Sequence, residues 1–499
     1  MPVLTLALSD IPEGVPHQPG DAPVILIREG REVTALGHLC PHLNLPLKKG
    51  VVRDGTLICA FHHACFSART GRQTQPPGHG DLSRYDATVD GETVTVTLPD
   101  DAASHAAPDH ATEGVDPTRV VIAGAGAAAE ACAHGLREDG FEGAIAMISP
   151  EARAPYDRTM LSKAVLTGAK NAADLTLTDA AALAARDIVL IPGRVVVIEP
   201  GRVTLEGGGI HAFDHLLVAP GGTPNVPDLP GIDLGGIHTL RDADHATAIA
   251  EAAGSARRAV LVGGGFIGME GALSLAKRGL EVTVILREEV PLARVLGDRV
   301  GRAIWAEHED AGVRFVTGAS VEGFDGDGQV EGVRIEGGDA VPADLVILAT
   351  GVRPATDGID GLPTERDGGV AVAADLSVPG LDGVHVAGDC ARVPTPFGPA
   401  RIEHWRVAQQ HGRAAARAIR GHAPEIDIPF FWTALARQYR YVGHATEWDE
   451  IRFDGDPSGP FLARYITDGR VMAALAAGRD ADLAALHLEM VAAGGPLPA

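Results

Sequence analysis

The chain has 499 residues, more than a single hydrophobic core of about 250 to 300 residues can serve, so we expect roughly three domains. Apolar residues make up 45% and charged residues 22%, a composition that excludes a disordered chain. The formal net charge of −24 opposes binding to nucleic acids or to an anionic membrane.

The first residues and the cysteines bear on the cellular compartment. Residues 1–10 lack the basic segment of a signal peptide, and no apolar run reaches the about 18 residues of a membrane helix. Five cysteines are too few, and odd in number, for a disulfide framework, so we expect metal binding or burial. They are Cys40, Cys59, Cys65, Cys132 and Cys390. We predict a cytoplasmic protein with no membrane or nucleic-acid partner.

The first hundred residues contain short alternating strands separated by turns. Strands are predicted over residues 22–27, 32–36, 56–59, 85–89 and 93–98. Asp90-Gly91 is a strong two-residue hairpin signal between the last two. This pattern predicts a small all-β domain over residues 1–100. Residues 101–117 show no apolar periodicity and are expected to form a linker.

From residue 118 onward, apolar strands alternate with alanine-rich helices. Residues 119–148 and 258–285 each contain a short apolar strand, a glycine turn, a helix and a second strand. This is a βαβ unit, and its repetition predicts an α/β region with two parallel, dinucleotide-binding sheets. An α+β C-terminal domain is predicted from strands over residues 439–444, 450–453, 461–467 and 470–475 and a helix near 480–491.

Two Cys–His pairs occur in the all-β domain, Cys40-Pro41-His42 and Cys59-Ala60-Phe61-His62. A structural zinc ion also takes two Cys and two His, but its usual arms contain Cys-x-x-Cys and paired His. Cys-x-His with Cys-x-x-His matches the Rieske arrangement, in which two cysteines hold one iron of a 2Fe–2S cluster and two histidines hold the other. We predict Cys40, His42, Cys59 and His62 as cluster ligands, with zinc or a lost cluster as the alternatives.

Residues 38–77 resemble a Rieske domain throughout, including Pro76-Pro77, which stand where the family has the loop covering the cluster. Respiratory-chain members of the family place Ser and Tyr hydroxyls near the cluster, where this chain has Ala64 and Phe66. Hydrogen bonds toward the cluster raise its reduction potential. The resemblance therefore implies a low-potential cluster that a nicotinamide cofactor can reduce.

A glycine-rich turn opens the first βαβ unit. Residues 124–129, Gly-Ala-Gly-Ala-Ala-Ala, follow a strand and precede a helix. The glycines permit a tight turn and close approach to a pyrophosphate, whose charge lies at the helix N-terminus. An acidic residue after the second strand binds the ribose in such units. The predicted contacts to an adenine dinucleotide are Gly124, Gly126, Ala128, Ala129 and Glu151.

Residues 155–163 closely resemble the segment after this strand in FAD-dependent ferredoxin reductases of the pyridine nucleotide–disulfide oxidoreductase superfamily. Residues 381–391 resemble the second FAD signature of that family, and residues 403–410 resemble the helix start beside its flavin ring. The resemblance implies FAD contacts from Arg158, Lys163, Val195, Asp389 and Trp405. A solvated surface lysine, a helix-capping aspartate and a core tryptophan are the alternatives.

The second βαβ unit contains a full Gly-x-Gly-x-x-Gly motif between the two FAD signatures, which fits an inserted NAD(P)-binding domain. In relatives the residue matching Glu270 lies near the nicotinamide and the flavin, so Glu270 and Lys163 are the predicted catalytic residues. Leu286 stands where NAD-specific proteins carry an acid and Arg287 favours NADPH, but Glu288 and Glu289 leave the choice open. The predicted NAD(P) contacts are Gly263, Gly265, Ile267, Gly268, Glu270, Arg287 and Gly351.

The resemblance also implies domain boundaries. The FAD-binding domain covers residues 118–240 and 358–424, and the NAD(P)-binding domain covers residues 241–357. Residues 425–499 match the C-terminal domain of such reductases, which packs near the flavin and often forms homodimers.

Disulfide reductases of this superfamily use a cysteine pair beside the flavin, whereas Cys132 and Cys390 are single and far apart in sequence. We therefore expect electrons to leave the flavin one at a time, with the fused cluster as first acceptor. The resemblance implies transfer from NAD(P)H through FAD to the 2Fe–2S cluster and on to a ferredoxin or an oxygenase component. The alternatives are an FAD-only NAD(P)H oxidase or quinone reductase with a structural Rieske domain, and a regulatory NAD(P)H sensor like apoptosis-inducing factor.

Overall fold

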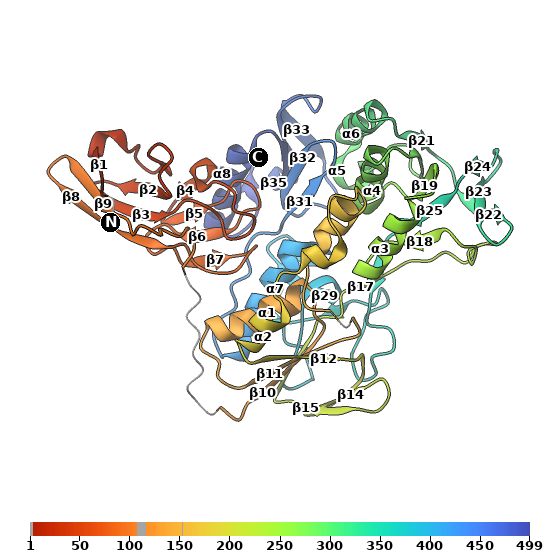
Figure 1. The fold of residues 1–499 in the computed structure, drawn as a ribbon, viewed down its shortest axis with the longest axis horizontal. Helices are drawn as coiled ribbons and strands as arrows, with labels where there is room; N and C mark the ends of the chain where they lie inside the picture. Colours follow the sequence, from red (N-terminus) through yellow and green to blue (C-terminus); the bar gives the residue numbers. More distant parts are fainter. Residues whose placement is uncertain (1–2, 107–115, 152) are drawn as a thin grey trace.

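The computed structural model describes residues 3–106, 116–151 and 153–499. Residues 107–115 of the predicted linker lie outside the described residues. Figure 1 shows an N-terminal β-rich part at one end of the molecule, beside the C-terminal strands and helix α8 (Asp480–Ala493), with two α/β units next to them. The predicted multidomain fold class is confirmed: an all-β part is followed by an α/β flavoprotein-type region and an α+β part.

The N-terminal part consists of two antiparallel sheets. Their strands are β1 (Val3–Ala7), β2 (Val24–Glu29), β3 (Glu32–Gly37), β4 (Val51–Arg53), β5 (Thr56–Ile58), β6 (Cys65–Ser67), β7 (Gln73–Gln75), β8 (Arg84–Asp90) and β9 (Thr93–Thr97). The sheet orders are β1-β9-β8-β3-β2 and β4-β5-β6-β7. The predicted hairpin at Asp90-Gly91 is confirmed, because Asp90 pairs with Thr93 across β8 and β9.

The first α/β unit is built on a five-stranded parallel sheet. The strands are β10 (Arg119–Ala123), β11 (Ala144–Ser149), β12 (Ile188–Pro192), β16 (His215–Val218) and β28 (Val384–Val386). Their order is β12-β11-β10-β16-β28, so the sheet is completed only after the second unit has been inserted. The other elements are α1 (Ala127–Glu138), α2 (Ala180–Ala184), α7 (Trp405–Ile419), β13 (Val195–Glu199), β14 (Arg202–Leu205), β15 (Ile210–Ala212), β27 (Val370–Ala371), β29 (Ala391–Thr395) and β30 (Gly398–Ala400).

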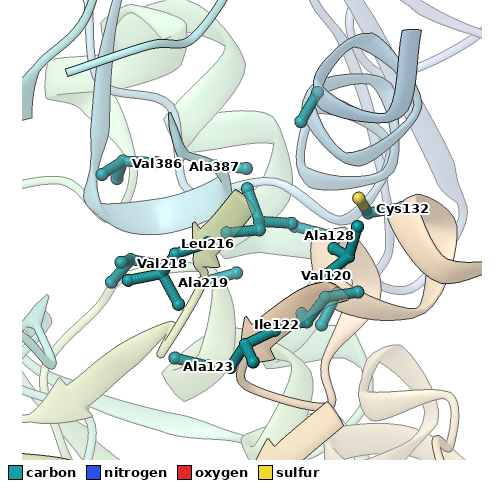
Figure 2. Packing of buried hydrophobic residues seen from close by; sticks show 14 of the residues in the cluster. Val120, Ile122, Ala123, Ala128, Cys132, Leu216, Val218, Ala219, Val386 and Ala387 are labelled. Carbon is teal, nitrogen blue, oxygen red and sulfur yellow. The ribbon is translucent and has the colours of Figure 1, made fainter. Parts of the chain in front are cut away.

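Small residues let the helices of this unit pack closely. A Cβ atom at Gly135 of α1 would lie 3.2 Å from the Cβ of Ala416 of α7, so the two helices touch almost backbone to backbone. Figure 2 shows Val120 and Leu216 of the sheet packed with Ala128 and Cys132 of α1. Strands buried on both faces, as in parallel sheets generally, form the core of the unit.

The second α/β unit repeats this plan. Its parallel strands are β18 (Ile237–Thr239), β19 (Arg258–Val262), β20 (Glu281–Ile285), β21 (Arg314–Val316) and β25 (Leu345–Leu348), in the order β18-β25-β19-β20-β21. Its helices are α3 (Ala243–Ala252), α4 (Phe266–Lys277), α5 (Ala293–Leu296) and α6 (Asp298–Asp310). Antiparallel strands β22 (Val321–Gly326), β23 (Val330–Ile335) and β24 (Val341–Pro342) extend it, and β17 (Gly222–Pro224) pairs with β26 (Val352–Pro354).

The C-terminal part is an antiparallel sheet with helix α8. Its strands are β31 (Phe430–Ala434), β32 (Gln438–Gly443), β33 (Glu450–Gly455), β34 (Phe461–Thr467), β35 (Arg470–Ala477) and β36 (Leu497–Pro498), and the sheet order is β31-β32-β35-β34-β33 with β36 on β35. The sequence did not predict β31. This strand forms one edge of the main sheet order, between the N-terminal part and the α/β units.

The two ends of the chain share a small core. Ile58 and Cys65 of the N-terminal part pack with Ala484 and Leu488 of helix α8. The N-terminal sheets are thus anchored on the last helix (Figure 1). In the part of the chain that the structure describes, no helix is both long and apolar enough to cross a membrane.

Candidate functional site

Two loops of the N-terminal part bring the four predicted cluster ligands together. Cys40 and His42 follow β3, and Cys59 and His62 follow β5. The Nδ1 atoms of His42 and His62 lie 3.1 Å apart, and the Cys40 and Cys59 thiols are hydrogen-bonded to each other. The third loop closes on them, because a Cβ atom at Gly78 would lie 2.8 Å from the backbone nitrogen of His42.

The chemistry of this donor set fits a 2Fe–2S cluster. Burial lowers the pKa of His42 to about 4 and that of His62 to about 2, so both imidazoles are neutral and have a lone pair for a metal. The donors form a thiol pair and an imidazole pair. Paired donors suit two irons better than one tetrahedral zinc.

A large cavity of about 1580 Å³ lies between the two α/β units and the C-terminal sheet. Typical ligand pockets have volumes of about 300–1,000 Å³, so this cavity has room for more than one cofactor. Most residues that the sequence predicts for the two dinucleotides line it: Gly124, Gly126, Ala128, Glu151, Arg158, Lys163, Val195, Gly265, Ile267, Glu270, Gly351, Asp389 and Trp405.

Four predicted contact residues do not line this cavity. Ala129 is fully buried within α1, where it serves helix packing. Gly263 and Gly268 shape the turn, since a Cβ at Gly263 would lie 2.3 Å from the Ala349 carbonyl oxygen and one at Gly268 would lie 2.1 Å from that of Gly263. Arg287 is exposed just beyond β20. The cavity wall thus contains Gly265 and Ile267 from this motif but not its two packing glycines.

Glu270 and Lys163, the predicted catalytic residues, form an ion pair in the cavity wall. The Lys163 Nζ lies 2.7 Å from Glu270 Oε2. The Ser162 hydroxyl donates to the same oxygen at 2.6 Å, and the Thr433 hydroxyl donates to Oε1 at 2.6 Å. Three donors from two separate segments, residues 162–163 and Thr433, therefore fix this carboxylate.

Further ion pairs lie on the cavity wall, and two of them involve residues predicted to contact FAD. Arg241, which the sequence reasoning missed, pairs with Asp389 at 2.6 Å. Arg158 pairs with Glu151 at 2.5 Å, and the Tyr156 hydroxyl donates to the same carboxylate at 2.7 Å. Glu151 thus has protein partners as well as access to the cavity.

Strand β31 touches both the cavity and the loops that carry the four ligands. Phe431, Trp432 and Thr433 line the cavity. The ring of Trp432 lies 4.6 Å from that of His62 and 5.8 Å from that of His42, between centroids. Phe430 stacks on His63 at 3.8 Å. Three consecutive aromatic residues in a chain with 4% aromatics were the sequence signal for this strand.

None of the five cysteines, all of which the structure describes, lies in the cavity wall. All five are free and buried. Burial raises the pKa of Cys390 and of Cys65 to about 12, so neither thiol is reactive near neutral pH.

The fold and the cavity define a flavoprotein with two dinucleotide-binding units, fused to a domain with paired Cys and His ligands. The model of the pyridine nucleotide-disulphide oxidoreductase family matches residues 118–412, and that of the Rieske [2Fe-2S] domain matches residues 2–86. The chain belongs to the pyridine nucleotide-disulphide oxidoreductase family and carries an N-terminal Rieske domain. It is an oxidoreductase whose cofactors are FAD, NAD(P)H and a 2Fe–2S cluster.

Named relatives fall into two groups. Apoptosis-inducing factor 3 of Homo sapiens is 30% identical over 489 residues, covering 94% of this chain and 80% of the human protein. The biphenyl dioxygenase system ferredoxin–NAD(+) reductase component of Paraburkholderia xenovorans is 34% identical, covering 72% of this chain and 89% of that protein. The solved covalent putidaredoxin reductase–putidaredoxin complex is similar with a TM-score of 0.71 and 29% identity, over 75% of this chain and 93% of that chain.

Proposed function

We propose that the chain is a ferredoxin-reductase-type enzyme that moves electrons from NAD(P)H through FAD to its own Rieske cluster and on to an external acceptor. The acceptor would be a ferredoxin or an oxygenase component, as in the system that the name of the Paraburkholderia relative describes. FAD, when bound, accepts a hydride and releases electrons one at a time.

The residues of the cavity have distinct tasks in this proposal. Gly126 and Gly265 are the N-cap residues of helices α1 and α4, so the N-terminal N–H groups of these helices receive the two pyrophosphates. Lys163 supplies a positive charge where negative charge develops on reduction. Glu270 keeps this lysine in place through their ion pair, and Ser162 and Thr433 hold the Glu270 carboxylate in turn.

The position of Trp432 carries the proposal. Its indole contacts the imidazoles of His42 and His62 and also lines the cavity. Electron transfer through protein weakens steeply with distance, so a packed aromatic contact between the two sites favours an internal relay. A purely structural N-terminal domain has no need to place its ligand histidines against the cavity wall.

The test is anaerobic addition of NADH or NADPH to the holoprotein. The visible flavin absorbance should bleach first, and the electron paramagnetic resonance signal of a reduced Rieske cluster should follow. A Cys40→Ser variant should still bleach but give no signal. Complete flavin bleaching without any cluster signal in the wild type would refute the internal relay and favour an FAD-only oxidase.

The cellular compartment and the oligomeric state of the enzyme are also proposals. We place the enzyme in the cytoplasm, because its five free cysteines are typical of that compartment. The C-terminal sheet is the surface through which we expect a homodimer to form. Size-exclusion chromatography with light scattering tests this second assignment.

A further inference from the structure

Two buried arginines from the flavoprotein part donate hydrogen bonds to backbone carbonyls of the cluster loops. Arg440, on β32, donates from Nε to the carbonyl oxygen of Phe61 at 2.5 Å. Phe61 lies between the ligands Cys59 and His62. Arg406, on α7, donates to the carbonyls of Pro76 at 2.9 Å and His63 at 3.0 Å. Two of the cluster loops are therefore held from outside their own domain.

Each arginine has one acidic partner. Arg440 pairs with Asp480 at 2.7 Å, and Arg406 pairs with Asp427 at 2.8 Å. The Asp427 pair is closed off from solvent, whereas the Asp480 side chain is 30% exposed at the start of α8. Arg440 is thus a buried cation whose counter-ion is partly screened by water.

The charge of Arg440 has an effect that a neutral donor would lack. A neutral side chain could satisfy the Phe61 carbonyl, and burying a guanidinium is costly even when it is paired. Reduction adds one negative charge to a Rieske cluster, and a nearby cation in a low-dielectric interior stabilises that charge. Net charge and hydrogen bonds around an iron–sulfur cluster set its reduction potential.

We propose that Arg440 is a positioning residue that holds the second ligand loop against the flavoprotein part and raises the reduction potential of the cluster. The proposal rests on the cluster that the proposed function requires. It also adds a contribution that the N-terminal domain alone does not contain, because Arg440 lies on β32 of the C-terminal sheet.

The experiment is a redox titration of the full-length holoprotein with chemical reductant and mediators, followed by the Rieske resonance. Arg440→Gln should lower the one-electron equilibrium constant for cluster reduction about tenfold, which corresponds to about 59 mV. Asp480→Asn should shift the potential in the opposite direction, because it leaves the arginine charge uncompensated. Arg53→Gln is the matched control, since Arg53 also crosses the interface to Glu489 at 2.9 Å but is exposed. It should leave the potential unchanged.

Opposite shifts distinguish an electrostatic role from simple loosening of the interface. An unchanged potential in Arg440→Gln, or shifts of the same sign in Arg440→Gln and Asp480→Asn, would overturn the proposal. If Arg440→Gln does not fold, Asp480→Asn decides: a raised potential supports the proposal, and an unchanged or lowered one refutes it. Chemical reductant fills the cluster without NAD(P)H, so a failed internal relay leaves this measurement intact.

Discussion

The Thr433 hydroxyl donates a hydrogen bond to Glu270 Oε1 at 2.6 Å, although the two residues are 163 positions apart. Thr433 lies on β31 of the C-terminal sheet, and Glu270 lies on α4 of the inserted α/β unit. The C-terminal part therefore supplies one of the hydrogen bonds that hold the Glu270 carboxylate, which pairs with Lys163. The C-terminal part thus contributes a side chain to the cavity wall that contacts Glu270 directly.

Thr433→Val should slow flavin reduction by NAD(P)H about tenfold. The substitution removes one hydrogen bond to a charged group, worth about 1.5 kcal/mol, and frees the Glu270 carboxylate to rotate away from Lys163. Stopped-flow absorbance of the flavin measures the rate. Thr433→Ser keeps the hydroxyl and should restore a rate close to that of the wild type; equal rates in the Val variant and the wild type would contradict this role.

Trp432→Leu should slow cluster reduction several-fold while leaving flavin reduction unchanged. Leucine removes the aromatic contact with His42 and His62 but keeps an apolar side chain on β31. Freeze-quench resonance spectra of the cluster provide the rate. Trp305→Leu is the control, because Trp305 packs at a tilt against Phe315 in the second α/β unit, with ring centroids 5.5 Å apart. A similar loss in both variants would point to general destabilisation.

Cys40→Ser and His62→Ala should each abolish iron and sulfide binding without loss of FAD. In the predicted arrangement the four side chains bind as two pairs, so removing one member would leave one iron with a single protein ligand. Metal analysis and the flavin-to-protein absorbance ratio measure the two cofactors separately. Stoichiometric zinc with no iron in the wild type would contradict the assignment.

Arg287→Ala should raise the KM for NADPH about tenfold and leave that for NADH nearly unchanged. Arg287 is exposed at the end of β20, where a cation binds the ribose 2′-phosphate, and the neighbouring Leu286 has no polar atom for a 2′-hydroxyl. Steady-state kinetics with NADPH and with NADH measure the two KM values. An equal rise in both KM values would show that Arg287 does not discriminate between them.

The pair His79–Glu130 predicts a pH-dependent attachment of the N-terminal part. His79 Nε2 lies 2.7 Å from Glu130 Oε2 on helix α1. Burial alone would lower the pKa of His79, but the Glu130 carboxylate outweighs burial and raises it. Burial raises the pKa of Glu130, but the facing His79 outweighs it and lowers this pKa to about 2.

A raised histidine pKa stabilises the folded chain fully below the unfolded value of about 6.5, and this contribution is lost as pH rises through the folded value. The depressed Glu130 pKa contributes above the unfolded value of about 4.3 and is lost as pH falls toward 2. We therefore expect the urea concentration at the midpoint of N-terminal detachment to decrease in two pH ranges. It should decrease as pH rises through the folded pKa of His79, and as pH falls below about 4.3 toward the folded pKa of Glu130.

His79→Gln is the control for this pH dependence and should abolish the alkaline decline. Glu138 and Arg413 also act on His79, with opposite signs. His134 lies 3.5 Å from Glu130, but burial lowers its pKa to about 4, so it stays neutral across the alkaline range. An alkaline decline that persists in His79→Gln would assign the effect to another group.

The ligand loops and the two glycine turns could be predicted because their chemistry is local. Cys40, His42, Cys59 and His62 lie within two short segments, and the helices α1 and α4 begin three residues after Gly124 and Gly263. Spacing alone therefore brings each set of functional atoms together.

The contacts of β31 and of the two buried arginines could not be predicted in this way. Phe61 and Arg440 are 379 positions apart, and Arg406 and Pro76 are 330 apart. Arg406 lies in a segment whose resemblance to a flavin-binding helix is clear, but its guanidinium faces the cluster loops instead. Only the packing of the N-terminal part on α7 and on the C-terminal sheet creates these contacts.

The shared core of Ile58, Cys65, Ala484 and Leu488 has a kinetic consequence. A separate carrier protein must find its reductase by diffusion, so delivery to it slows on dilution. Tethering turns such an encounter into an intramolecular event with a high effective concentration. Reduction of the cluster in the N-terminal domain should therefore proceed at the same rate per molecule in a dilute solution as in a concentrated one. Only electron transfer to the external acceptor should depend on how often molecules collide.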